Sequence, residues 1–179
     1  MKNSLYKYYT PFFCEENCWK LLNSFSSQSL DNFRVLILTN KFRTIALANQ
    51  SAGPPDRFIL WDYHVIVWDS EESLIYDLGS TLGIPVSTSL YYEFTFTDQS
   101  LLPEELRTSV RVIPAIHYIE NFYSDRSHML GDKGKVLKPF PDWPVIQRGN
   151  LTLSKILDFN LSDHFFKEFL PVSTFFDDI

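Results

Sequence analysis

Residues 58–78 read FILWDYHVIVWDSEESLIYDL, two runs rich in β-branched and aromatic residues with a polar segment between them. The first run covers residues 58–68, and the second covers residues 73–78. Residues 69–72 (DSEE) form the polar segment. Two such runs joined by a short polar connection are typical of a β-hairpin. The stretch therefore predicts antiparallel β-structure at the centre of the fold.

The hairpin brings two of its polar side chains together. If residues 69–72 form a four-residue loop, Trp68 pairs with Ser73. In that register His64 pairs with Asp77, and directly opposed residues share a face with Cβ atoms about 4.5–5.5 Å apart. A carboxylate placed there accepts a hydrogen bond from one imidazole nitrogen, which fixes the tautomer and stabilises the imidazolium. A register change of one residue would put the two side chains on opposite faces.

A helix is expected upstream of the hairpin. Pro11 suits the first turn of a helix, with Thr10 able to cap it, and the Ser- and Asn-rich stretch at residues 23–29 suits its end. Apolar side chains then recur along one face, at Cys14, Cys18, Leu21, Leu22 and Phe25. Cys14 is therefore expected near the N-terminus of this helix, with Cys18 one turn further in.

Cys14 is the better candidate for a nucleophile. A disulfide between residues four apart would constrain little of the chain, and two cysteines alone do not make a usual zinc site. A helix N-terminus and a nearby imidazolium both stabilise a thiolate, so we expect a lowered thiol pKa at Cys14 and a core role for Cys18. The alternative is a purely structural role, in which Cys14 also packs as a small hydrophobic residue.

The rest of the chain predicts one α+β domain spanning residues 1–179, because no repeat or linker divides it. Residues 125–148 are rich in Gly and Pro and predict a long loop. Pro114 weakens the centre of its expected strand, and Asn150 or Thr152 could cap the last helix. The remaining expected elements are strands at residues 33–39, 43–48 and 111–116, a short helix at residues 102–107 and a helix at residues 151–159.

Composition limits the class of protein. Hydrophobic residues make up 45% and charged residues 21% of the chain, which is ordinary for a soluble globular protein. A net charge of −6 argues against nucleic acid as a partner. No apolar run approaches the roughly 20 residues that span a bilayer, and residues 1–7 lack a signal-peptide core. We therefore expect a cytoplasmic monomer with free thiols and no membrane partner, metal or cofactor.

Four segments resemble motifs of the protein N-terminal glutamine amidohydrolases, and together they span about residues 10–160. Gly79 departs from the family, which usually has a second acidic residue there, and the chain after residue 159 matches poorly. The matching segments are residues 13–21 (FCEENCWKL, like CEEN-x-WKL), 61–65 (WDYHV, the family signature), 75–78 (IYDL, like IYDLD) and 122–129 (FYSDRSHM, like NF-x-SDRSHM).

The resemblance implies a Cys-His-Asp triad on a transglutaminase-like or papain-like α+β fold, with the nucleophile on the N-terminal helix. By motif, Cys14 is the nucleophile, His64 the base and Asp77 its orienting carboxylate. The family converts the N-terminal Gln of proteins or peptides to Glu and releases ammonia. In eukaryotes, where a nuclear location is also expected, the new Glu is arginylated in a degradation pathway.

Recognition of a chain terminus requires a group that binds a free α-ammonium. Glu15, Glu16 and Asp62 are acidic and close to the proposed catalytic residues, although Glu15 and Glu16 can also be surface residues that complement the helix dipole. The predicted substrate-binding residues are Glu16, Asp62, Tyr63 and Ser127.

Residues 125–128 have two interpretations, since they can shape the pocket or form an internal ion pair that orders the loop. The activity also has alternatives. A cysteine peptidase or an internal-glutamine deamidase could use the same triad, because a thiol, an imidazole and a carboxylate suit any acyl transfer. An inactive module that binds N-terminal residues is the third possibility.

Overall fold

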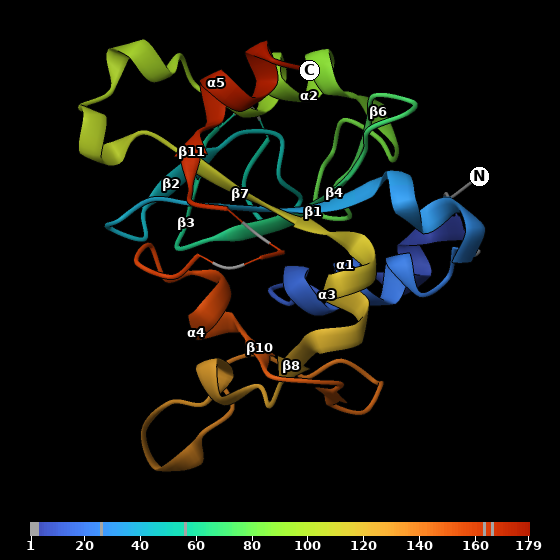
Figure 1. The fold of residues 1–179 in the computed structure, drawn as a ribbon. Helices are drawn as coiled ribbons and strands as arrows, with labels where there is room; N and C mark the ends of the chain where they lie inside the picture. The colour runs from blue at the N-terminus through green and yellow to red at the C-terminus, as the bar shows by residue number, and fades with distance from the viewer. Residues whose placement is uncertain (1–3, 26, 56, 163, 166) are drawn as a thin grey trace.

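A computed structural model describes residues 4–25, 27–55, 57–162, 164–165 and 167–179 (Figure 1). Its largest element is a six-stranded sheet with the strand order β11-β7-β1-β4-β5-β6, in which every neighbouring pair is antiparallel. The α+β class and the antiparallel sheet are thus confirmed. The strands are β1 (Phe33–Thr39), β4 (His64–Asp69), β5 (Leu74–Tyr76), β6 (Val86–Ser87), β7 (Ser109–Pro114) and β11 (Leu170–Pro171).

Two smaller sheets flank the main one. β2 (Ile45–Leu47) pairs with β3 (Ile59–Trp61), and β8 (Phe122–Ser124) lies between β9 (Ile146–Gln147) and β10 (Leu151–Thr152). The α-helices are α1 (Cys14–Leu22), α2 (Thr88–Thr95), α3 (Ala115–Asn121), α4 (Leu153–Ile156) and α5 (Val172–Asp177). The 3-10 helices are η1 (Ser4–Tyr8), η2 (Ser27–Asn32), η3 (Gln99–Leu101), η4 (Glu104–Leu106), η5 (Ser127–Met129) and η6 (Asp132–Gly134).

Helices cover both faces of the main sheet, with α1 and α3 on one side and α2 and α5 on the other (Figure 1). Alternate residues of β1 point to opposite faces. Val35 and Ile37 belong to the core cluster that includes α1 and α3, whereas Leu36 and Leu38 belong to the cluster that includes α2 and α5. Burial on both faces explains why residues 35–38 form a continuous apolar run rather than an alternating one.

The predicted hairpin exists, but its predicted strand register was wrong by two residues. The pairs are Val67 with Tyr76, Trp68 with Ile75 and Asp69 with Leu74, so the loop is residues 70–73. Asp69 stays in the strand because its carboxylate caps the turn, accepting hydrogen bonds from the amides of residues 71 and 72. An even shift keeps every side chain on its predicted face.

The predicted strand at residues 58–68 was also wrong as a single element. It divides into β3 and β4, which belong to different sheets, with Asp62 and Tyr63 between them. The predicted strand at residues 33–39 is confirmed as β1. That at residues 43–48 shortens to β2, which pairs with β3 rather than with β1.

Helix α1 begins later than expected. Its first residue is Cys14, and the N-cap is Phe13 rather than Thr10. Thr10 instead exchanges two hydrogen bonds with Asn17, between its backbone amide and carbonyl and the Asn17 side chain. The helix ends at Leu22; Ser26, within the expected end region, lies outside the described residues. Cys14 is therefore the helix-starting residue itself.

Downstream, several elements are shorter than predicted. Pro114 ends β7 rather than interrupting its centre, and α3 follows at once. The helix expected at residues 102–107 is the 3-10 turn η4, and that at residues 151–159 shrinks to α4. Thr152 caps α4 by accepting a hydrogen bond from the Lys155 amide, so of the two candidate caps Thr152 is confirmed.

Arg111 on β7 anchors the C-terminal part of the chain from α4 onward. Its side chain is fully buried, and its guanidinium lies 4.2 Å from the centre of the Phe169 ring. Five hydrogen bonds from one buried guanidinium tie this segment to the central sheet. They run to the carbonyl groups of Lys155, Ile156, Asp158, Leu161 and Lys167.

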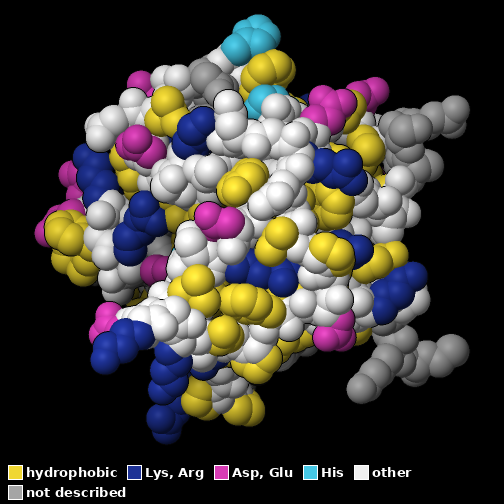
Figure 2. Space-filling model, turned by 90° about the horizontal axis from the view of Figure 1, so that it is seen from below, with side chains coloured by type: hydrophobic (Ala, Val, Ile, Leu, Met, Phe, Trp, Pro, Cys, Tyr) yellow, Lys and Arg dark blue, Asp and Glu magenta, His cyan; other side chains and the backbone are white. Residues whose placement is uncertain are grey.

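Basic side chains do not gather into one patch on the face drawn in Figure 2, where Lys and Arg are scattered among hydrophobic and acidic side chains. Lys133, Lys135 and Lys138, the one dense basic stretch of the sequence, are exposed. Within the described ranges, no helix combines the length and apolar character needed to cross a membrane.

Candidate active site

His64 and Asp77 meet at the end of the hairpin. His64 is the first residue of β4, and Asp77 directly follows the last residue of β5. The His64 Nε2 atom lies 2.9 Å from the Asp77 Oδ1 atom, and both side chains are almost completely buried. The predicted contact is therefore confirmed, with the two residues as diagonal rather than directly opposed neighbours.

The Asp77 carboxylate accepts four hydrogen bonds. Oδ1 accepts from His64 and from the Gly79 amide at 2.8 Å, and Oδ2 accepts from Gln50 Nε2 at 3.0 Å and Tyr91 Oη at 2.9 Å. Burial alone would raise the pKa of this carboxyl, but the His64 charge and these hydrogen bonds outweigh it, so the pKa is lowered. Asp77 is therefore ionised at neutral pH. No sequence pattern pointed to Gln50 or Tyr91.

The His64 ring is held so that one nitrogen remains available. Trp61 stacks on it with ring centres 5.7 Å apart and an angle of 22° between the planes. Nε2 faces Asp77, whereas Nδ1 is buried and has no hydrogen-bond partner among the described residues. A small cavity beside the ring is lined by His64, Asp77, Cys14 and Cys18. Nδ1 is thus the nitrogen free to exchange a proton with another group in this cavity.

Cys14 lies where this small cavity meets a larger cleft of about 600 Å³. It is partly exposed, whereas Cys18 is buried and donates a hydrogen bond from its thiol to the Val65 carbonyl at 3.2 Å. A ligand in the cleft can therefore contact the Cys14 thiol, and the expected core role of Cys18 is confirmed. Among the residues that line the cleft are Cys14, Asp62, Tyr63, Asp125, Ser127 and His128.

The expectation of a lowered thiol pKa at Cys14 was wrong. Although the residue is partly exposed, the surrounding protein removes water from its thiol, and this desolvation raises the pKa of the thiol well above its usual value. The negative charge of Glu15 adds to the effect. The thiol donates a hydrogen bond to Glu15 Oε2 at 3.6 Å. The helix N-terminus and a nearby imidazolium had together suggested a thiolate, but the loss of water and the neighbouring carboxylate reverse the direction of the pKa shift.

Glu15 and Glu16 are not surface residues, because both side chains are completely buried. Glu16 accepts hydrogen bonds from Ser124 and from Arg126 Nε on one oxygen, and from Arg126 Nη2 and Trp143 on the other. This is the internal ion pair that was one interpretation of residues 125–128, and it ties the loop to α1. Glu16 does not line the cleft.

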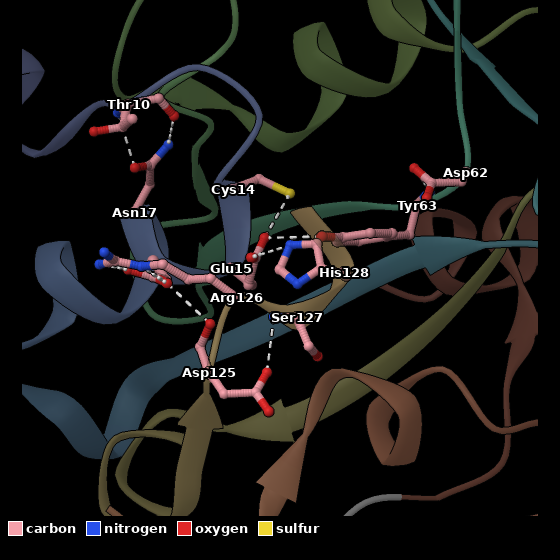
Figure 3. A network of polar contacts seen from close by, with 12 residues as sticks. Thr10, Cys14, Glu15, Asn17, Asp62, Tyr63, Asp125, Arg126, Ser127 and His128 are labelled. Carbon is pink, nitrogen blue, oxygen red and sulfur yellow. Dashed lines mark hydrogen bonds and ion pairs between the residues drawn. The ribbon is translucent and has the colours of Figure 1, made fainter. Parts of the chain in front are cut away.

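Glu15 faces the cleft wall instead (Figure 3). Its Oε2 atom accepts a hydrogen bond from Tyr63 Oη at 3.0 Å, and its Oε1 atom lies 3.2 Å from His128 Nε2. Burial lowers the pKa of His128, but the interaction with Glu15 outweighs it, so the pKa of His128 is raised. A buried carboxylate and an imidazole that favours its charged form thus lie beside Cys14.

The sequence model of the N-terminal glutamine amidase family matches residues 9–172, which include every residue of the site described above. The chain belongs to this family. A protein N-terminal glutamine amidohydrolase of Caenorhabditis briggsae is 36% identical over 160 residues, covering 86% of this chain and 85% of the relative. Those of Bos taurus and Homo sapiens are each 34% identical over 148 residues, covering 79% of this chain and 72% of each relative.

In this family member, three of the four predicted substrate-binding residues line the cleft. Asp62 and Ser127 are exposed, and Tyr63 is buried with its hydroxyl on Glu15. Gly79, where the family usually has an acidic residue, contributes its backbone amide to Asp77. Across the part of the chain that the structure describes, no group of three or more His, Cys, Asp or Glu side chains is placed to hold a metal ion.

In the protein without substrate, alkylation of Cys14 by iodoacetamide is expected to become faster as the pH rises. A thiol with a raised pKa is neutral at pH 7, so its thiolate fraction grows about tenfold per pH unit below that pKa. The alkylation rate should therefore rise without a plateau between pH 6 and pH 8. Mass spectrometry of the peptide that contains Cys14 measures this rate. Cys18, in the same peptide and buried, should stay unmodified. A constant rate across this range would mean a preformed thiolate–imidazolium pair.

Proposed function

We propose that this protein converts the N-terminal glutamine of proteins and peptides to glutamate and releases ammonia. The observation that carries the proposal is a thiol at the junction of an open cleft and a cavity that contains the buried His64–Asp77 pair. Family membership supports it, because the relatives are named protein N-terminal glutamine amidohydrolases. Cys14 is the proposed nucleophile, His64 the general base and Asp77 its orienting carboxylate.

The first half of the reaction forms a thioester. Cys14 Sγ attacks the side-chain amide carbon of the substrate while its proton passes to His64 Nδ1, so a thiol that is neutral beforehand suffices. Backbone N–H groups in the first turn of α1, including that of Cys14, stabilise the resulting oxyanion. These groups are available because the first N–H groups of a helix have no hydrogen-bond partner within it. The His64 imidazolium then donates its proton to the amide nitrogen. The C–N bond breaks, and ammonia leaves.

The second half hydrolyses the thioester. Water attacks the acyl carbon and gives a proton to His64 Nδ1, the C–S bond breaks, and the proton returns to the Cys14 sulfur. The ionised Asp77 stabilises the imidazolium in both halves. The chemistry is complete without a cofactor, since every proton is carried by these side chains or by water.

A helix-borne thiol beside a strand-borne imidazole supports a transglutaminase-like or papain-like arrangement of the single domain. We assign Asp62, Tyr63 and Ser127 to contacts with the bound peptide, because all three line the cleft. Glu16 is better assigned to holding the loop, since both its oxygens are already hydrogen-bonded twice. The cytoplasmic location, the monomeric state and the degradation pathway remain expectations.

Peptides that differ in the position and chemistry of one residue test the proposed function. Ammonia release should occur with Gln at position one and should be lost with N-acetylated Gln, with internal Gln and with Asn at position one. The amide of Asn is one methylene shorter and does not reach Cys14 with the backbone held in place. Ammonia from internal Gln would favour the general deamidase, and backbone cleavage the peptidase. Binding without ammonia release would favour the inactive module.

A further inference from the structure

The Glu15 carboxylate lies behind the wall of the cleft that Cys14, Tyr63 and His128 form (Figure 3). It is completely buried, and its Oε2 atom is 3.6 Å from the Cys14 sulfur and 3.0 Å from the Tyr63 hydroxyl. A buried negative charge beside the sulfur raises the thiol pKa, which works against forming a thiolate. Activation of Cys14 therefore does not account for the position of Glu15.

One oxygen of Glu15 is incompletely bonded. Oε1 has no hydrogen-bond partner among the described residues, and neither does His128 Nε2, although the two atoms are 3.2 Å apart. The pair is close enough for an ion pair but is misaligned for a hydrogen bond. The adjacent Glu16, equally buried, has two hydrogen bonds on each oxygen. Because a buried carboxylate oxygen without a donor is costly, Glu15 Oε1 is suited to receive a donor from a ligand.

The substrate carries a suitable donor at the right distance. In an N-terminal Gln, four covalent bonds separate the amide carbon from the α-nitrogen, so the two atoms lie about 4–5 Å apart. Attack requires the amide carbon at about 3–3.5 Å from the Cys14 sulfur. With Glu15 Oε2 at 3.6 Å from the same sulfur, the α-ammonium of a bound Gln can reach this carboxylate.

Two other carboxylates near the cleft are weaker candidates. Asp62 and Asp125 are exposed, and one oxygen of each already accepts a backbone amide, from Tyr63 and Ser127 respectively. An exposed ion pair contributes little to binding, whereas a buried charge discriminates strongly against a ligand that leaves it unpaired.

We propose that Glu15 binds the α-ammonium of the substrate, and that protonated His128 holds this place in the free enzyme and leaves the carboxylate when substrate binds. This inference rests on the proposed function and names the group that makes it specific for a chain terminus. An acetylated or internal Gln brings no positive charge and leaves Glu15 without a counter-ion.

Charged groups around His128 make the exchange dependent on pH. Burial favours the neutral ring, but the acidic side chains around it outweigh burial and raise its pKa. As pH rises through this pKa the imidazolium loses its proton and stops competing, so KM for the peptide should fall. Above about pH 8 the substrate amine itself deprotonates and KM should rise again. The charged groups facing this site are Glu15 and Glu16 on α1, Asp62 before β4, and Asp125 and Arg126 after β8.

The test compares a Gln-Xaa peptide with its desamino analogue, in which hydrogen replaces the α-ammonium. Wild-type enzyme should prefer the peptide by about 100-fold or more in kcat/KM, the scale expected for one buried charge pair. Glu15→Gln should reduce this preference to less than about threefold. Any effect of the lost charge on the Cys14 thiol acts on both reactions and cancels in their ratio. Asp125→Asn, the matched control, should keep the preference, because Asp125 is an exposed cleft residue with no assigned peptide contact. Asp62→Asn tests the alternative carboxylate and should also keep the preference.

Three outcomes would count against the assignment. Loss of the preference in Asp62→Asn instead, or an equal loss of both reactions in Glu15→Gln, would overturn the role of Glu15 and leave the proposed function standing. No ammonia from Gln-Xaa with wild-type enzyme would overturn the proposed function and this inference with it.

A second measurement keeps Glu15 intact. In calorimetry at about pH 7 with two buffers of different ionisation enthalpy, binding of Gln-Xaa to the non-reacting Cys14→Ala variant should release a measurable fraction of a proton, because the imidazolium that leaves Glu15 returns toward its ordinary pKa of about 6.5. Adding His128→Asn should abolish this release. Binding without proton release by the Cys14→Ala variant would overturn the exchange between His128 and the substrate.

Discussion

Replacing Cys14 with alanine is expected to lower kcat for ammonia release from a Gln-Xaa peptide by at least about a thousandfold, because no other group can form the thioester. Cys14 is the first residue of α1 and borders both the cleft and the cavity that holds His64. Residual activity would reflect only the positioning and the oxyanion-stabilising amides that the variant retains. Release of ammonia from the peptide, measured under saturating substrate, gives the result directly.

Cys18→Ala is the matched control for this substitution. The two thiols lie one helical turn apart, but Cys18 is buried and its thiol bonds to the Val65 carbonyl. Its removal should cost about 1 kcal/mol of unfolding free energy and leave kcat within a few-fold of wild type. If Cys14→Ala retained activity, or if both variants lost it equally, Cys14 would not be the nucleophile.

The contact between His64 and Asp77 was predictable even though the register was not. Moving the hairpin loop by one residue changes the pairing by two positions, and side chains alternate with a period of two. Each side chain therefore stays on its predicted face of the sheet in spite of the error in register. The turn position itself was decided by Asp69, whose carboxylate caps the loop from within the strand. Sequence composition alone had placed that residue in the loop.

The roles of Glu15 and Glu16 were not predictable from local sequence. Acidic residues in a first helical turn are usually solvated, and nothing nearby in the chain suggests burial. Glu16 is buried because Arg126 and Trp143, more than 100 residues away, supply its hydrogen bonds. The loop that carries Arg126 also brings His128 against Glu15. Burial, together with the charge of Glu15, reverses the expected shift of the Cys14 pKa. Tertiary contacts, rather than helix position, thus determine the electrostatics of this site.

Asp77→Asn should reduce kcat by about a hundredfold or more, because the neutral amide no longer stabilises the His64 imidazolium. The Gly79 amide is a fixed donor on the same side as His64, so the new side chain should keep its oxygen there and leave the tautomer unchanged. The lost charge is then the main difference. Since the pKa of Asp77 is lowered, the wild-type carboxylate stays ionised across the working pH range, and the deficit should persist from pH 6 to pH 8.

Tyr91→Phe separates the charge of Asp77 from the network that surrounds it. This variant removes one hydrogen bond from Oδ2 but keeps the carboxylate, Gln50 and the contact with His64. A neutral donor contributes about 1 kcal/mol, so kcat should fall by less than about tenfold. If Tyr91→Phe instead matched Asp77→Asn in kcat, the loss would come from disorder in the network rather than from the missing charge. If Asp77→Asn stayed near wild type, His64 would need no carboxylate, and the triad would reduce to a dyad of Cys14 and His64.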